Sequence, residues 1–127
     1  MRIYRFGREV GRAIERSGSR GVTFSPILRG RELAYAGCMY LEPQGIIGQH
    51  EASMDQLLLV VQGSGVVSGA DAQAVDVEPG CAVFWERGEV HETQAGADGL
   101  VAVVVEGERL DPGTSMSLWA SAVAAEQ

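Results

Sequence analysis

The stretch at residues 45–65, GIIGQHEASMDQLLLVVQGSG, decides how the rest of this 127-residue chain is interpreted. It begins and ends at glycines, and it holds His50, one of only two histidines in the chain. Polar residues occupy its first half, whereas residues 57–61 form an unbroken apolar run. The pattern predicts a β-strand over residues 46–62, polar toward its start and buried on both faces toward its end.

Residues two apart in a strand share a face, so one face of this strand contains His50. If no bulge intervenes, that face becomes apolar along its length, through His50, Ala52, Met54, Gln56, Leu58 and Val60. In a barrel it would be the lumen face, with the polar end at the mouth. The opposite face of residues 57–61 is also apolar and requires its own cover, either a second sheet or a second copy of the chain.

The rest of the chain alternates short apolar segments with glycine- and proline-containing turns. Further strands are predicted at residues 3–6, 22–24, 33–41, 66–67, 72–77, 81–85, 90–94 and 100–106. Turns are predicted at residues 42–45, 63–65, 68–71, 78–80, 86–89 and 96–99. Short strands at this spacing are typical of an all-β sandwich or barrel. We therefore divide the chain into a basic arm (1–24), a barrel (25–110) and a tail or short helix (111–127).

Charge is distributed unevenly along the chain. Residues 1–31 hold eight arginines and two acidic residues, a net charge of +6, whereas residues 32–127 hold two arginines and fifteen acidic residues, a net charge of −13. The arm is therefore expected either to lie on an acidic body, its own or a neighbour's, or simply to be solvated. The overall charge of −7 argues against nucleic acid and anionic membranes as partners.

The remaining bulk features indicate a cytoplasmic protein. The chain shows no signal peptide, and no apolar run approaches the roughly 18–20 residues that span a membrane. Cys38 and Cys81 lack metal-ligand spacing, so we expect free, packed thiols.

Two motifs in the chain resemble those of the cupin superfamily. Members of this superfamily are small double-stranded β-helix (jelly-roll) barrels. The first cupin motif has glycine, five residues, His-x-His, three or four residues, glutamate, six residues and glycine. This chain has Gly45, four residues, His50, Ala52 in place of the second histidine, Gln56 in place of the glutamate, and Gly63.

The second cupin motif has glycine, five residues, Pro-x-Gly, two residues, histidine, three residues and asparagine. This chain has Gly80, Glu86 in place of the proline, Gly88, His91, and Ala95 in place of the asparagine. The resemblance implies an all-β cupin barrel of the small, single-domain bacterial kind.

In that family three histidines and a carboxylate hold a divalent metal. Carried over residue by residue, the ligand positions here are His50, Gln56 and His91, because Ala52 has no ligating group. The resemblance thus implies a weakened site for Zn, Fe, Ni or Mn, if any metal is bound, since two imidazoles and a neutral amide bind weakly. Strand alternation predicts that the nearby carboxylates Glu51, Asp55 and Glu92 point away, and it leaves the direction of Glu89 open.

The same residues also suit a site without metal. His50 and His91 can bind a polar ligand group or transfer a proton, which makes them the candidate catalytic pair. Gln56 offers a donor and an acceptor, while Met54, Trp85 and Thr93 complete the candidate ligand-binding set. Alternatively, both histidines are remnants in the lumen, hydrogen-bonded to Gln56 or Thr93.

Three functions remain compatible with these residues. The first is a protein that binds a small organic ligand with a reduced metal site. The second is an enzyme of the isomerase, cyclase or dioxygenase type that uses His50 and His91. The third is a structural or regulatory module with a vestigial pocket. In each case the doubly apolar segment at 57–61 predicts a homodimer.

Overall fold

The computed structural model describes residues 1–14, 22–24, 27–28, 32–71 and 73–119 of the chain. Within these ranges the elements are β1 (Arg2–Arg5), the 3-10 helix η1 (Arg8–Val10), β2 (Arg12–Ile14), β3 (Val22–Phe24), β4 (Glu32–Leu41), β5 (Ile46–Glu51), β6 (Asp55–Ser68), β7 (Ala74–Val77), β8 (Cys81–Trp85) and β9 (Val90–Glu108). Across those ranges, no helix has the length and apolar character needed to cross a membrane.

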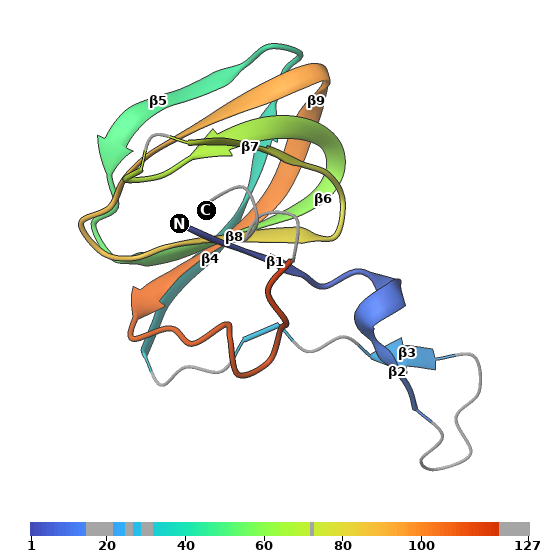
Figure 1. Ribbon diagram of the computed structural model, residues 1–127. Coiled ribbons are helices and arrows are strands. Elements are labelled where there is room, and N and C mark those ends of the chain that lie inside the picture. Colours follow the sequence, from blue (N-terminus) through green and yellow to red (C-terminus); the bar gives the residue numbers. More distant parts are fainter. Residues whose placement is uncertain (15–21, 25–26, 29–31, 72, 120–127) are drawn as a thin grey trace.

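Antiparallel pairing joins seven of the strands into a barrel, which confirms the predicted all-β jelly roll (Figure 1). One side of the barrel has the strand order β1-β8-β6-β9-β4. The other side is formed where β7 pairs with the end of β6 and β5 pairs with the start of β9. The two long strands β6 and β9 pair with each other on both sides and therefore connect them.

Glycine allows the long strands to bend without ending. Gly63 in β6 and Gly99 in β9 have positive φ values of 81° and 76°. A Cβ on Gly63 would clash with the carbonyl oxygen of Gly99, so the two backbones approach closely at this corner. The turns predicted at 63–65 and 96–99 were therefore wrong. Both segments are bends inside continuous strands, and residues 90–94 and 100–106 belong to one strand, β9.

The strand predicted over residues 46–62 was also wrong in one respect. It is interrupted between Glu51 and Asp55, where the chain bends. The interruption is fixed by the turn at 86–89, because the Ala52 N–H donates to the Glu89 carbonyl (3.0 Å) and the Gly88 N–H donates to the Ala52 carbonyl (2.8 Å). Strict alternation therefore does not extend from His50 through Met54.

The lumen is filled by apolar side chains of β1, β4, β6, β7, β8 and β9, among them Leu58, Val60, Val83, Trp85, Leu100, Ala102 and Val104. A second cluster covers the outer face of β6 and β8. There Tyr4, Leu110 and Met116 pack against Leu57 and Leu59. The outer face of residues 57–61 was predicted to need a cover. The chain's own terminal segments cover Leu57 and Leu59, while Val61 is exposed.

The remaining segments give a mixed outcome. Residues 111–119 form turns and an isolated bridge between Tyr4 and Leu118, with no helix, and residues 120–127 of the predicted tail lie outside the described ranges. Both cysteines are free, as expected. Cys81 is packed in the core, but Cys38 is exposed, because it lies on the outer face of β4.

Candidate functional site

The two histidines of the chain meet at one end of the barrel. His50 near the end of β5 and His91 at the start of β9 are direct cross-strand partners. Their ring centroids are 4.3 Å apart, and the planes are tilted by 52°. His50 is exposed and His91 is buried, so one imidazole faces solvent while the other lies behind it.

Each imidazole is held by a backbone carbonyl two residues earlier in the chain. His50 Nδ1 lies 2.8 Å from the Gly48 carbonyl oxygen, and His91 Nδ1 lies 3.0 Å from the Glu89 carbonyl oxygen. A carbonyl oxygen can only accept, so in both rings Nδ1 carries the hydrogen and donates it. In the neutral form each Nε2 is then an acceptor, available to a ligand. The remnant interpretation expected hydrogen bonds from the histidines to Gln56 or Thr93. Neither ring makes such a bond.

Trp85 at the end of β8 backs the buried histidine. Its ring centroid lies 4.4 Å from that of His91 with a 30° tilt, close to an offset stack. The indole N–H donates to the Ser68 carbonyl oxygen at 3.0 Å, which fixes the ring. Because Trp85 has no exposed surface, it is the rear wall behind His91.

Burial lowers the pKa of His91 below the ordinary histidine value of 6.5. The nearby His50 lowers this pKa further, and the hydrogen bond to the Glu89 carbonyl and the carboxylates of Glu89 and Glu106 oppose the shift only in part. His91 is therefore a neutral acceptor at neutral pH.

A carboxylate that the sequence analysis did not select lies beside this end of the lumen. Glu106 in β9 is the cross-strand partner of Gln56 in β6, and Gln56 Nε2 donates to Glu106 Oε1 at 2.6 Å. The signal for it was present, because Leu100, Ala102, Val104 and Glu106 alternate along one strand face and the first three fill the lumen. Gln56 thus has a charged partner.

The other acidic residues near the motifs stabilise loops. Asp55 accepts the N–H groups of Arg87 (3.0 Å) and Leu110 (3.1 Å). Glu89, whose direction the sequence left open, accepts the Met1 amino group (2.6 Å), the Ala70 N–H (3.0 Å) and the Glu86 N–H (3.2 Å). These carboxylates hold the turns at one end of the barrel, and that of Glu89 also acts on the nearby His91 by opposing the lowering of its pKa.

The donor set does not fit a tightly held divalent metal. Two imidazole Nε2 atoms are available, but the Gln56 amide and the Glu106 carboxylate bind each other. In the part of the chain that the structure describes, no three His, Cys, Asp or Glu side chains gather so as to hold a metal ion. Two imidazoles without a completing carboxylate bind divalent ions weakly.

The remaining candidate residues lie at different depths. Thr93 is buried on β9, two residues beyond His91 and on the same strand face. Met54 lies half-exposed in the bend between β5 and β6. The structure therefore brings together His50, His91 and Trp85, with Thr93 beside them and the Gln56–Glu106 pair near His91.

Comparison with known proteins agrees with this fold. A family model described as a cupin domain matches residues 37–107. None of the proteins with curated functions matches the chain. Similar solved structures include KdgF from Halomonas sp. (24% identity, 66% of this chain and 72% of that chain, TM-score 0.52). Another is a predicted oxalate decarboxylase from Thermotoga maritima (21% identity, 57% of this chain and 64% of that chain, TM-score 0.53). A cupin-like protein from the same organism is also similar (21% identity, 60% of this chain and 61% of that chain, TM-score 0.54). The match covers less than two thirds of each Thermotoga protein, and likeness at these identities shows the fold alone.

Proposed function

The chain belongs to the cupin domain family, and from that premise we propose that it binds a small organic ligand at the polar end of its barrel. The observation that carries the proposal is the histidine pair. Both imidazoles have Nδ1 fixed on a backbone carbonyl, which leaves two Nε2 acceptors on adjacent strands. A few convergent polar groups beside an apolar lumen suit such a ligand.

The polar groups at this end favour a ligand that donates hydrogen bonds. His91 offers a neutral Nε2 acceptor beside the imidazole of His50, and Glu106 adds a carboxylate whose second oxygen is not used by Gln56. A ligand bearing hydroxyl or amino groups would satisfy these acceptors, whereas Glu106 would repel a carboxylate. We therefore propose a neutral polyol or an amino-bearing compound as the ligand class.

Two glutamates of β9 provide a matched test, because Glu106 lies on the lumen side of the strand and Glu92 lies on its outer side. Thermal-shift screening and calorimetry would compare neutral polyols, amino sugars and small carboxylic acids on the wild type, Glu106→Gln and Glu92→Gln. Glu106→Gln should weaken binding of amino-bearing compounds by roughly tenfold, the effect of one charge-assisted hydrogen bond. Glu92→Gln, next to His91 in sequence but on the other strand face, should leave it unchanged.

If none of the three compound classes shifts the melting temperature, and His91→Gln behaves like the wild type throughout, the polar end has no ligand. The barrel would then be a structural module with a vestigial pocket.

A second candidate function is an acid–base enzyme of the isomerase or cyclase type. It is favoured by His91, a neutral imidazole whose orientation is fixed by Nδ1 and whose Nε2 can accept a proton from a bound substrate. Turnover should then decrease as the pH falls through the lowered pKa of His91. A flat pH profile in an otherwise active protein would exclude this role.

A dioxygenase type would require a metal, and the donor set does not support one. Metal analysis of protein purified without chelator should find less than one equivalent. A stoichiometric metal that is lost in His50→Ala would overturn the metal-free proposal.

A further inference from the structure

We propose that a groove on the outside of the barrel binds a small organic anion through Arg2 and Arg87. The groove has a volume of about 470 Å³ and lies where the start of β1 meets the turn between β8 and β9. A volume of this size is typical of small-molecule sites. None of His50, Gln56 and His91 lines the groove, so it is a different site from the histidine end.

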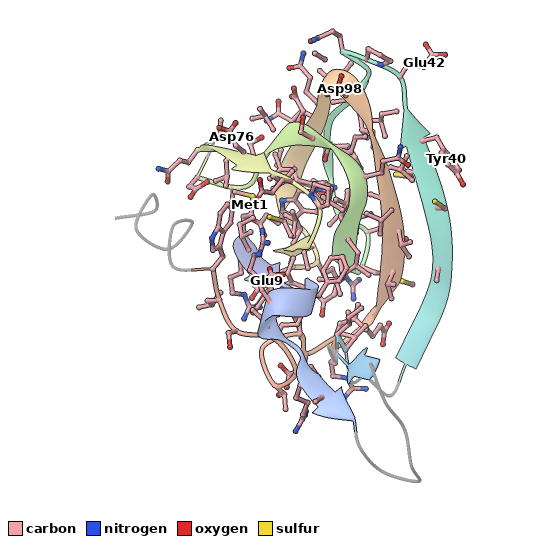
Figure 2. All side chains as sticks on the ribbon, turned by 90° about the vertical axis from the view of Figure 1, so that its right-hand side faces the viewer. Met1, Glu9, Tyr40, Glu42, Asp76 and Asp98 are labelled. Carbon is pink, nitrogen blue, oxygen red and sulfur yellow. The ribbon has the colours of Figure 1, made fainter. Side chains whose placement is uncertain are left out.

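The groove is built by three segments that are far apart in the sequence. Met1 precedes β1, Ala70 lies in the turn between β6 and β7, and residues 86–89 form the turn between β8 and β9. The Glu89 carboxylate joins these segments, because it accepts the Met1 amino group, the Ala70 N–H and the Glu86 N–H. Figure 2 shows Met1 on the side of the barrel away from β4. The walls of the groove are therefore held in place by hydrogen bonds.

Arg87 brings to this groove a positive charge that has no ionic partner among the described residues. Its backbone N–H donates to Asp55, but its exposed side chain forms none of the ion pairs of the described ranges. Arg87 is also one of only two arginines among residues 32–127, which hold fifteen acidic residues. One of the few positive charges of the acidic body thus lines the groove and is not neutralised there.

Arg2 supplies the second positive charge of the groove. Its guanidinium carbon lies 4.7 Å from the centroid of the Phe84 ring, and its Nη2 lies 3.4 Å from Glu86 Oε1. That distance exceeds the roughly 2.7–3.2 Å of a good N–H···O bond, and both charged side chains are exposed, so the ion pair is weak. A guanidinium has five N–H donors, and the bond to Glu86 leaves donors for an anion.

Arg5, at the other end of β1, shows the contrasting case of an occupied guanidinium. It donates to Glu9 at 2.6 Å, to Glu78 at 3.2 Å and to the Cys81 Sγ at 3.4 Å. Its charge is therefore neutralised by two carboxylates of the same chain. The arginines of the groove lack such a set of partners, which is the arrangement expected where a ligand supplies the negative charge.

The donors and the walls of the groove indicate the ligand class. The planar fork of an arginine side chain matches a carboxylate or a phosphate. A bare oxyanion would fill only a small part of the groove, and Met1 and Ala70 provide uncharged walls for the rest. The ligand is therefore a compact molecule with one carboxylate or phosphate on an uncharged body. This preference is opposite to that of the histidine end, where Glu106 disfavours a carboxylate.

The primary experiment is calorimetry on the full chain at low salt with four probes. Benzoate and phenyl phosphate carry the two candidate anionic groups, benzamide is the uncharged counterpart of benzoate, and inorganic phosphate lacks the organic body. The two organic anions should bind more tightly than the two controls, and the tighter of them identifies the anionic group. Added sodium chloride should weaken their binding, because it screens the arginine charges.

Three variants assign the binding to the groove. Arg87→Gln should weaken binding of the organic anions at least about tenfold, the effect of losing a charge-assisted hydrogen bond. Glu86→Gln should strengthen binding roughly threefold, because it removes a nearby carboxylate and frees Arg2. Arg12→Gln is the control, since it removes an exposed arginine of β2, which projects from the barrel (Figure 1), and should change nothing.

Two further measurements separate this site from the histidine end. In NMR titrations with benzoate, the amide signals of Ala70 and Gly88, which line the groove, should shift, while that of Gly48 should not. His91→Gln should leave benzoate binding unchanged, and Arg87→Gln should leave binding of amino-bearing compounds unchanged. Failure of one proposal is therefore distinguishable from failure of the other.

The absence of binding by both organic anions, or equal affinities for benzoate and benzamide, would overturn the proposal. An affinity that is unchanged in Arg87→Gln would also overturn it, because the anion would then bind at another place. Equal affinities for phenyl phosphate and inorganic phosphate would contradict the organic body of the ligand.

Discussion

The two ends of the lumen are lined by the same strands but by different chemistry. The inward positions of β6 run from Gln56 through Leu58 to Val60, and those of β9 run from Glu106 to Ala102. One end thus holds a hydrogen-bonded polar pair near the histidines, and the other holds only close-packed aliphatic side chains. From Asp55 to Val60 the pairing of β6 with β9 keeps one register, so the register does not change where the chemistry does.

This difference separates stability from binding. The aliphatic end is fully buried and makes no polar contact, so its side chains contribute through burial and packing. The polar end is partly open, and its contacts are few and specific. We expect substitutions at the aliphatic end to change the free energy of unfolding, and substitutions at the polar end to change ligand binding.

The largest effect is expected from Leu58→Ala at the aliphatic end. Leu58 is 2% exposed inside the lumen, and removing three buried carbon atoms from a close-packed site costs about 2–5 kcal/mol. Urea denaturation measures the change. Leu118→Ala, at a leucine that is 49% exposed, is the control and should stay within about 0.5 kcal/mol of the wild type. Equal effects in the two variants would contradict the comparison.

A smaller effect is expected from Gln56→Leu at the polar end. The change removes the 2.6 Å hydrogen bond to Glu106, and both side chains are half-buried, so the cost should be about 1 kcal/mol. Gln62→Leu alters an exposed glutamine of the same strand and should have no measurable effect. If Gln56→Leu cost as much as Leu58→Ala, the two ends would not differ as proposed.

The pH dependence sharpens the comparison further. The pKa of His91 is lowered in the folded state, so the unfolded chain binds a proton more readily. The stability that neutral His91 contributes is fully present above the ordinary pKa of about 6.5 and is lost as the pH falls from there through the lowered pKa of the folded state. Urea midpoints at pH 7.5, 6.5 and 5.5 should therefore decrease more in the wild type than in His91→Gln. Parallel curves for the two proteins would show that His91 does not titrate in this way.

The smallest effect on stability is expected from His50→Ala. His50 is exposed and bonds only to the carbonyl of Gly48, so unfolding should change by less than about 0.5 kcal/mol. The same variant should lose affinity for any ligand held by the histidine pair. A large loss of stability would mean that the exposed imidazole supports the fold.

Much of this architecture follows from the sequence. Glycine and proline residues in the turns delimit the short strands in the sequence. The strand predicted at residues 81–85, for example, coincides with β8 (Cys81–Trp85). The spacing of the two motifs also placed His50 and His91 at one site, because both occupy positions that a cupin barrel brings together. These predictions succeeded where the signal lies within one element or within a known motif.

The rest depended on contacts between distant parts of the chain. Gln56 and Glu106 are 50 residues apart, and only the register of β6 against β9 makes them partners. The bend after His50 is imposed by hydrogen bonds from the 86–89 turn, which no local pattern reveals. Likewise, Gly63 and Gly99 look like turn residues until their pairing partners are known, because glycine serves in turns and bends alike.

The pairing of β6 with β9 also has a kinetic consequence. It joins Ser68 to Glu92 at one end and Asp55 to Gly107 at the other, so every contact closes a loop of more than twenty residues that contains β7 and β8. Proteins dominated by such non-local pairings fold in about milliseconds to seconds, far more slowly than helical bundles. The partners farthest apart in the chain, Gln56 and Glu106 among them, close the longest loops. We therefore expect the polar end to be completed late in folding, so that recovery of ligand binding lags behind the burial of the aliphatic end.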